Sequence, residues 1–255
     1  PAVWGHFRRF FPVALQREAE LGDGPYMFGY HPHGIFGFGA LTNLALDRGP
    51  WRALFPGIGD RIRLLTVDTN FYVPLWRELL TAVGLAGVGR ASIHGLLDRR
   101  CSVGIVMGGG REALLARPGT ADVIIRRRMG FFRIALERGV PVVPIWGFGE
   151  NDVYDQQPPG TGLAILQQWM LGLAGFTIPA FRGRGVFSYD SGFLPRRSRI
   201  VVVVGRPIDP GPPIAAPTAK DIAALQDRYI AQLERLYRRH ADEYNSGKVP
   251  LRVVQ

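Results

Sequence analysis

Short runs of apolar residues alternate along the chain with segments in which apolar residues recur every three or four positions. Several of the runs are continuously apolar, which is typical of strands covered on both faces of a sheet. The periodic segments are typical of helices with one buried face. The expected strands span residues 26–30, 62–67, 103–107, 122–125, 140–146 and 200–204, and the expected helices span 39–47, 74–83, 92–100, 129–138 and 218–244.

This alternation predicts an α/β fold. We expect a layered single domain with a mostly parallel central sheet flanked by helices, and a long C-terminal helix. Thr218 and Asp221 resemble a capping box and are expected to start that helix, while Ser92 is the expected N-cap of an earlier one.

The first 24 residues are expected to form a helix of their own, ahead of a domain over residues 25–255. Apolar side chains between residues 3 and 21 keep helical spacing and are interleaved with Arg8, Arg9 and Arg17. A basic amphipathic helix of this kind suits a membrane surface, and it suits packing against the protein's own core about equally well.

No uninterrupted apolar run approaches the roughly 20 residues that a membrane-spanning helix needs. The most apolar stretch, residues 163–181, is interrupted by Gln167 and Gln168. We expect a core helix or an interfacial helix there, with Trp169 and Met170 as membrane contacts.

Composition and charge narrow the choice of partners. The 255 residues are 47% hydrophobic, enough for a sizeable core, and the single Cys101 excludes an internal disulfide framework. The net charge is +10, and all of the 31 basic residues except Lys220 and Lys248 are arginines. This excess predicts a polyanionic partner, such as an anionic membrane surface or a phosphate-rich ligand. Nucleic acid is not expected, because the chain shows neither a recognisable reading module nor stacking aromatic residues among the basic ones.

The segment His31-Pro32-His33-Gly34 carries the clearest chemistry. It follows the expected strand 26–30 and therefore stands at the edge of the sheet. Imidazole has a pKa of about 6.5 and suits proton transfer near neutral pH. Pro32 stiffens the segment, and Gly34 leaves room for a ligand or another backbone. Residues i and i+2 of an extended chain share one side, so both rings can face one pocket; a buried turn with two hydrogen-bonded histidines is the alternative.

Residues 28–35, Phe-Gly-Tyr-His-Pro-His-Gly-Ile, resemble the signature of the type-2 diacylglycerol acyltransferase family, which includes monoacylglycerol and wax-alcohol acyltransferases. Further blocks similar to the family's follow in its order, so the resemblance covers most of the chain. These blocks are residues 107–114 (Met-Gly-Gly-Gly-Arg-Glu-Ala-Leu), 117–119, 128–131, 142–144, 147–151, 183–187 and 217–222.

The resemblance implies an acyl-CoA-dependent O-acyltransferase that transfers a fatty acyl group to a neutral lipid alcohol. Diacylglycerol, giving triacylglycerol, is the leading acceptor, and a monoacylglycerol or a long-chain wax alcohol is the alternative. Acyl-CoA is then a cosubstrate, and no further cofactor or metal is implied. The implied setting is a membrane, either the endoplasmic reticulum or the lipid droplet surface. In the family a hydrophobic hairpin commonly precedes this region, whereas the present sequence begins at Pro1, and the oligomeric state stays open.

Acyl transfer from a thioester needs a base for the alcohol. A thiol of pKa about 8.5 leaves readily, whereas the attacking hydroxyl must lose a proton. No G-x-S-x-G elbow occurs, so no covalent serine intermediate is expected. The wider glycerolipid acyltransferase group places an Asp five residues after its catalytic histidine, but Phe36 and Phe38 stand five after His31 and His33. Alignment with that group puts His31 in the place of the base, and His33 is the alternative.

Glu112 is the expected orienting carboxylate. It follows an expected strand and the glycines Gly108, Gly109 and Gly110, so it stands at a strand end, where open α/β sheets place their sites. A carboxylate that accepts the imidazole N–H would fix the tautomer and stabilise the imidazolium. The glycine amides would hold the thioester oxyanion or form a tight turn. Without a catalytic role, Glu112 would be an acid in the first turn of a helix.

Binding roles are expected for five further residues. Arg111, Arg182 and Arg184 would hold the phosphates of coenzyme A, with a surface role as the alternative for each. Glu150 and Asn151 follow another expected strand and would line the acceptor pocket.

Two other functions remain open. A metal-dependent hydrolase would use His31 and His33 as a ligand pair completed by Glu112 or Glu150, although no third histidine stands at a strand end. A non-catalytic module that binds lipid or anions is the second.

Overall fold

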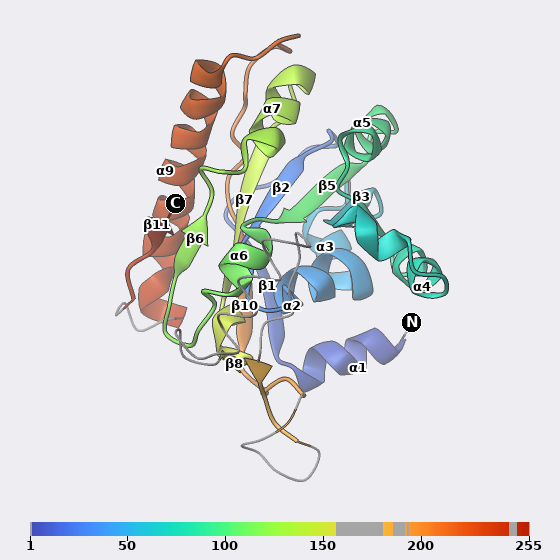
Figure 1. The fold of residues 1–255 in the computed structure, drawn as a ribbon, viewed down its shortest axis with the longest axis vertical. Coiled ribbons are helices and arrows are strands. Elements are labelled where there is room, and N and C mark those ends of the chain that lie inside the picture. Colours follow the sequence, from blue (N-terminus) through green and yellow to red (C-terminus); the bar gives the residue numbers. More distant parts are fainter. Residues whose placement is uncertain (1, 157–180, 186–191, 193, 245–248, 255) are drawn as a thin grey trace.

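The structure, a computed structural model, describes residues 2–156, 181–185, 192, 194–244 and 249–254. Its centre is a seven-stranded sheet of order β1-β10-β7-β2-β5-β3-β4 (Figure 1). Every neighbouring pair is parallel except β10 and β7, so the expected α/β fold with a mostly parallel sheet is confirmed. The strands of this sheet are β1 (Val13–Arg17), β2 (Met27–His31), β3 (Ile62–Thr66), β4 (Leu85–Gly87), β5 (Ser102–Val106), β7 (Val142–Phe148) and β10 (Ile200–Val204).

Helices cover both faces of the sheet. Alternating side chains of the central strands enter two separate cores: Met27 and Trp146 pack with α5, α7 and α9, whereas Phe28 and Ile145 pack with η1 and α3. The described helices are α1 (Ala2–Phe10), α2 (Phe38–Leu41), α3 (Gly49–Leu54), α4 (Trp76–Ala82), α5 (Arg90–Asp98), α6 (Gly109–Ala113), α7 (Met129–Arg138) and α9 (Ala219–Tyr244), with a π-helical turn η1 (Thr42–Leu46) and the 3₁₀ turns η2 (Asp68–Phe71) and η3 (Glu150–Asp152).

The long C-terminal helix is confirmed, and so is its N-terminal capping box. The Asp221 backbone N–H donates to Thr218 Oγ1 at 3.2 Å, and the Thr218 N–H donates to Asp221 Oδ2 at 2.8 Å. The expected N-cap at Ser92 is wrong, because α5 begins at Arg90 after Gly89.

One expected strand belongs to a different sheet. β6 (Asp122–Ile124) pairs in parallel with β11 (Arg252–Val254) outside the central sheet. A further small sheet joins β8 (Asp155–Gln156) to β9 (Phe181–Arg182). The apolar content of residues 122–125 indicated a strand but could not indicate its partner.

The helix expected over the first 24 residues is wrong beyond Phe10. Pro12 offers no backbone N–H and disfavours a helical conformation in the residue before it, so the helix ends ahead of it. The chain continues as β1, which pairs in parallel with β10 at the edge of the central sheet. Residues 13–17 therefore share the sheet of the rest of the chain.

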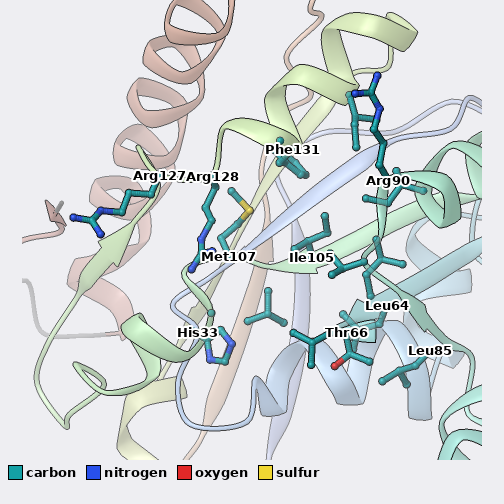
Figure 2. A pocket seen from close by; sticks show the side chains of 18 of the residues that line it. His33, Leu64, Thr66, Leu85, Arg90, Ile105, Met107, Arg127, Arg128 and Phe131 are labelled. Carbon is teal, nitrogen blue, oxygen red and sulfur yellow. The ribbon is translucent and has the colours of Figure 1, made fainter. Parts of the chain in front are cut away.

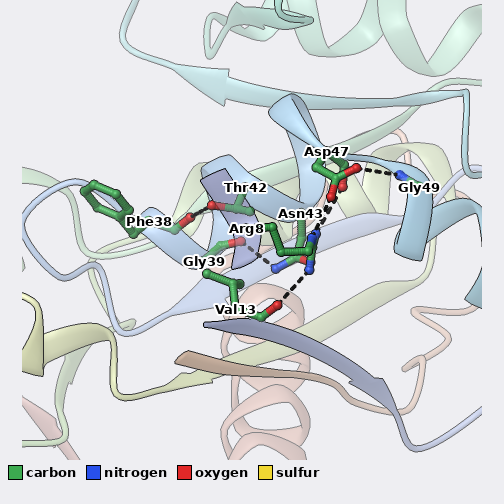
Figure 3. Close-up of polar contacts among 8 residues, drawn as sticks. All are labelled: Arg8, Val13, Phe38, Gly39, Thr42, Asn43, Asp47 and Gly49. Carbon is green, nitrogen blue, oxygen red and sulfur yellow. Dashed lines mark hydrogen bonds and ion pairs between the residues drawn. The ribbon is translucent and has the colours of Figure 1, made fainter. Parts of the chain in front are cut away.

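Arg8 holds α1 against the protein. Its guanidinium reaches Asp47 Oδ2 at 2.7 Å, Asn43 Oδ1 at 2.7 Å and the Val13 carbonyl at 3.0 Å (Figure 3). Asn43 in turn donates to the Gly39 carbonyl at 2.8 Å. Of the two uses expected for this helix, the structure shows packing against η1; contact with a membrane stays a prediction.

None of the described helices combines the length and the apolar content needed to cross a bilayer. The helix expected within residues 163–181 lies, apart from Phe181, outside the described residues.

Candidate active site

Three neighbouring parallel strands bring the predicted site residues to one edge of the sheet. β2 lies between β5 and β7, and all three run in the same direction. His31 ends β2, Glu112 follows β5, and Glu150 follows β7. The carboxyl ends of parallel strands meet at one edge, so these side chains approach although they are far apart in the sequence.

His31 is fully buried and faces the interior. Its Nε2 lies 3.0 Å from the hydroxyl of Tyr229 on α9, and that hydroxyl donates to the Gly29 carbonyl, also at 3.0 Å. The hydroxyl has one proton, which goes to the carbonyl, so Nε2 of His31 carries the hydrogen and donates to the oxygen of Tyr229. Within the described part of the chain His31 Nδ1 has no hydrogen-bond partner. Burial, and then the neighbouring His33, lower the pKa of His31 to about 3, so its ring is neutral.

His33 lines a cavity of about 710 Å³ (Figure 2). Its Nδ1 lies 3.0 Å from the Gly34 carbonyl, which can only accept, so Nδ1 is protonated and Nε2 holds the free lone pair. Burial lowers the pKa of His33 and the cation of Arg128 lowers it further, while the bond to Gly34 opposes both. His33 is thus a neutral imidazole with an available basic nitrogen.

The expectation that both rings face one pocket is wrong. Strand β2 ends at His31, so the alternation of an extended chain does not continue to His33. Among the described residues that line the cavity, His33 is present and His31 is not.

Glu112 holds the backbone of the motif and not an imidazole. Its Oε1 accepts the His33 backbone N–H at 2.6 Å, and its Oε2 accepts the Ile124 N–H at 2.6 Å. Within the described residues no hydrogen bond joins Glu112 to either ring, so the expected carboxylate–imidazole bond is not formed. The Gly34 carbonyl orients the His33 ring in its place. Burial raises the pKa of Glu112 to about 8, while the two amide donors and the Arg128 cation oppose the rise.

Gly108 and Gly109 form a tight turn around Glu112. Gly108 has φ +81°, and a Cβ there would overlap Oε2 of Glu112. Gly109 has φ +61°, lines the cavity, and donates its N–H to the Met107 carbonyl at 2.9 Å. Of the two roles expected for these glycines, the structure shows the tight turn; Gly110 continues it as the second residue of α6.

Arg128 is the residue that sequence reasoning did not select for the site. Its guanidinium donates to the Gly108 carbonyl and lies beside His33 in the cavity wall (Figure 2). Within the described residues its Nε has no hydrogen-bond partner. The signal in the sequence was its place in the block 128–131, where it was counted only as part of a basic run.

Glu150 is buried and fixes the loop after the motif. It accepts the Tyr30 hydroxyl at 2.6 Å and the backbone N–H groups of Phe38 and Gly39 at 2.6 and 2.9 Å. Burial raises the pKa of Glu150 to about 7, although these three donors oppose the rise. Gly34, at φ +58°, leaves the space that Glu150 fills, since a Cβ there would lie 2.8 Å from Cγ of Glu150. Gly34 therefore makes room for a side chain of the protein.

Asn151 does not reach the cavity at His33. Its amide donates to the Thr120 carbonyl at 2.9 Å. Together with Glu150 it lines a separate polar cavity of about 260 Å³. The structure therefore does not bring these two residues to the cavity that His33 lines.

The three arginines expected to bind phosphate lie elsewhere. Arg111 and Arg182 are exposed on α6 and β9. Arg184 donates to the Pro195 carbonyl at 3.2 Å, and its guanidinium lies 5.2 Å from the ring centroid of Phe10 on α1. The arginines that the described part of the chain contributes to the cavity lining are Arg90, Arg127, Arg128 and Arg133.

The rest of the cavity wall is mainly apolar. β3, β4 and β5 form one side and α5 and α7 the other, with His33 and Arg128 at one end (Figure 2). The apolar lining includes Leu64, Leu65, Leu85, Val88, Ile93, Ile105, Phe131 and Ile134. A volume of about 710 Å³ is in the range of pockets that bind small organic ligands.

Fold and site together define an α/β enzyme with a histidine base beside a long-walled apolar cavity. The family model of diacylglycerol acyltransferase matches residues 1–254. Diacylglycerol O-acyltransferase 2B of Umbelopsis ramanniana is 38% identical over 97% of this chain and 72% of its own length. Diacylglycerol O-acyltransferase 2 of Dictyostelium discoideum is 38% identical over 93% and 73%, and human 2-acylglycerol O-acyltransferase 1 is 36% identical over 95% and 73%. No solved structure matches the chain. The chain belongs to the diacylglycerol acyltransferase family, as its motifs predicted.

The metal-dependent hydrolase finds no ligand set in the described residues. No three His, Cys, Asp or Glu side chains cluster there in a way that could hold a metal ion. His31 and His33 are instead engaged by Tyr229 and by the Gly34 carbonyl.

Proposed function

We propose that this protein transfers a fatty acyl group from acyl-CoA to the free hydroxyl of diacylglycerol, giving triacylglycerol. The observation that carries the proposal is His33, a neutral imidazole whose free Nε2 belongs to the wall of a large apolar cavity. The names of the relatives support an acyltransferase that acts on acylglycerols. A monoacylglycerol is the second candidate acceptor, because 2-acylglycerol O-acyltransferases are among those relatives.

In this reaction His33 acts as the general base. Its Nε2 takes the proton of the acceptor hydroxyl while the hydroxyl oxygen attacks the thioester carbonyl, forming the new C–O bond. The tetrahedral intermediate carries a negative charge, and the Arg128 guanidinium beside His33 stabilises it. Collapse breaks the C–S bond, and the departing thiolate takes the proton from the imidazolium. A positioned base of this kind typically contributes about 10²–10⁴-fold to the rate.

The cavity lining suits the two parts of an acyl-CoA. The apolar side chains suit the acyl chain, whereas Arg90, Arg127 and Arg133 suit the phosphates of coenzyme A. Figure 2 shows Arg127 extending away from the cavity, toward the side from which a ligand would approach. Acyl-CoA is thus the cosubstrate, and the chemistry requires no other cofactor. The setting that fits such substrates is the membrane of the endoplasmic reticulum or the lipid droplet surface.

The test is thiol release from oleoyl-CoA in detergent micelles that contain diacylglycerol, 2-monoacylglycerol or hexadecanol, with the lipid products separated by chromatography. We expect release that depends on diacylglycerol and yields triacylglycerol, with His33→Ala as the inactive control. Triacylglycerol formation unchanged in His33→Ala would overturn the assignment of the base. Release that ignores the acceptor would show a thioesterase, and faster product formation with monoacylglycerol would make that the acceptor.

A further inference from the structure

One short segment of the surface concentrates large exposed apolar side chains. They come from η2, from α4 and from the residues next to these elements. Leu75 is 84% exposed and Tyr72 is 78% exposed. We call this set the 67–79 patch: Val67, Tyr72, Val73, Leu75, Trp76 and Leu79. Half-exposed apolar residues scattered singly are ordinary, but this many in 13 positions mark an interaction surface.

The patch projects outward from a well-anchored base. η2 and α4 pack against each other, and Leu80 of α4 is buried against the protein while Leu79 and Trp76 are exposed. Figure 1 shows α4 at the edge of the molecule, on the opposite side of the sheet from α9. Leu75, the N-cap of α4, has φ +66°, a conformation that a branched side chain adopts only at a cost in free energy. The fold thus holds a large apolar residue in a strained, exposed position.

The patch is continuous with the rim of the cavity at His33. Val67 belongs to both, because it lines the cavity and is 48% exposed. Phe36, which lies three residues after His33, also lines the cavity and is 48% exposed. An apolar path therefore runs from the outer surface of α4 to the cavity.

The charges around the patch favour an anionic surface. Beyond the C-terminal end of α4, the Arg48 guanidinium lies next to Gly84, and Arg63 and Arg52 are close to Arg48. The acids nearby are engaged: Asp60 pairs with Arg52 at 2.5 Å, and Glu78 pairs with Arg77 at 2.5 Å. The Asp68 carboxylate accepts the Gly89 N–H at 3.2 Å. Arginines that flank exposed apolar side chains are the combination that binds the headgroup region of a membrane.

We propose that the 67–79 patch inserts into the surface of a phospholipid bilayer and places the mouth of the His33 cavity against the lipid. The acceptor alcohol would then enter the cavity from the bilayer without crossing water; this last clause rests on the proposed function, whereas the membrane contact does not.

The direct test places a fluorescent reporter on the patch. In a Cys101→Ser background, Leu75→Cys is labelled with the environment-sensitive dye NBD, and vesicles of phosphatidylcholine with a minor fraction of phosphatidylserine are added. We expect brighter, blue-shifted emission that spin-labelled lipid quenches. The matched control is Leu194→Cys, because Leu194 is an exposed leucine outside the patch, at 39%. Emission at position 75 that stays unchanged on adding vesicles overturns the proposal. Emission that is already blue-shifted without lipid also overturns it, since the patch is then covered by the protein itself or by a second copy.

The second measurement uses Tyr72→Asp/Leu75→Asp, with Leu194→Asp as control. The double variant should bind the same vesicles about ten-fold or more weakly, because burial of one large apolar side chain is worth about 1.5–3 kcal/mol. Activity on diacylglycerol in vesicles should fall with it, while activity on a water-soluble short-chain diacylglycerol should be kept. Loss of both activities in the folded variant overturns the role of the patch in lipid access. If the parent protein binds vesicles through position 75 and transfers no acyl group, the proposed function fails and the membrane contact stands.

Discussion

The two histidines of the motif lie two residues apart and in different surroundings. His31 faces the interior, where the Tyr229 hydroxyl accepts its Nε2–H and where its pKa falls to about 3. His33 faces the cavity, with Nδ1 tied to the Gly34 carbonyl and Nε2 free. The same side chain is therefore a structural link between β2 and α9 in one place and a base in the other. The surroundings and not the residue type set the role.

The two buried carboxylates show a similar contrast on either side of β2. Glu112, after β5, holds the His33 backbone, and Glu150, after β7, holds Tyr30 and the loop at Phe38. Both use their oxygens on groups of the protein and leave the reacting proton to His33. Together they fix the segment that carries the base from its two neighbouring strands, which is how a short loop reaches the precision that catalysis needs.

The largest expected effect breaks the comparison at His33. His33→Ala should lower kcat by about 10²–10⁴-fold, the usual contribution of a general base. Stability should change little, because the ring bonds only the neighbouring Gly34 carbonyl. Product formation and urea unfolding of the same preparation check both halves. Activity within a few-fold of the parent would move the base to another residue.

The next largest effect lies on the interior side. Tyr229→Phe removes the hydroxyl that accepts from His31 and donates to Gly29, at about 1–3 kcal/mol for each buried group left unpaired. The free energy of unfolding should fall by that order, while kcat of the folded protein should fall far less than in His33→Ala. A loss of kcat as large as that of His33→Ala, without a loss of stability, would place His31 in the chemistry.

Glu112→Gln should separate the two carboxylates. An amide can accept from only one of the His33 and Ile124 N–H groups, so one buried donor loses its partner at about 1–3 kcal/mol. Thermal unfolding should show the loss, and kcat should fall because the His33 backbone is held less firmly. Glu150→Gln is the matched control: we expect a comparable loss of stability and a smaller loss of kcat.

The pH profile gives the smallest effect and sharpens the assignment of the base. Only the neutral imidazole accepts a proton, so kcat/KM should rise with pH through the pKa of His33. Burial and Arg128 lower that pKa, so the acid limb should lie below the ordinary pH 6.5. Arg128→Met removes the nearby cation and should move the limb upward, toward 6.5. A limb that stays in place in this variant would mean that Arg128 does not act on the base.

The sequence by itself determined the fold class and the edge of the sheet where the site lies. The ranges of α7 and β10 were predicted correctly, because apolar periodicity is local. His33 and Glu112 were found because each follows an apolar run, and parallel strands carry functional residues at their carboxyl ends. The helix over the first 24 residues failed where Pro12 ends it and β1 begins, since strand pairing with β10 depends on a segment far along the chain.

Only the tertiary structure decided what each site residue contacts. Tyr229 lies 198 positions from His31, and Glu150 lies 120 positions from Tyr30, so no local pattern could pair them. The choice between two histidines, the bonds of Glu112 to backbone amides, and the place of Arg128 beside the base all follow from how strand ends and α9 pack. Such contacts depend on three-dimensional proximity, whereas periodicity and motif spacing report only neighbours along the chain.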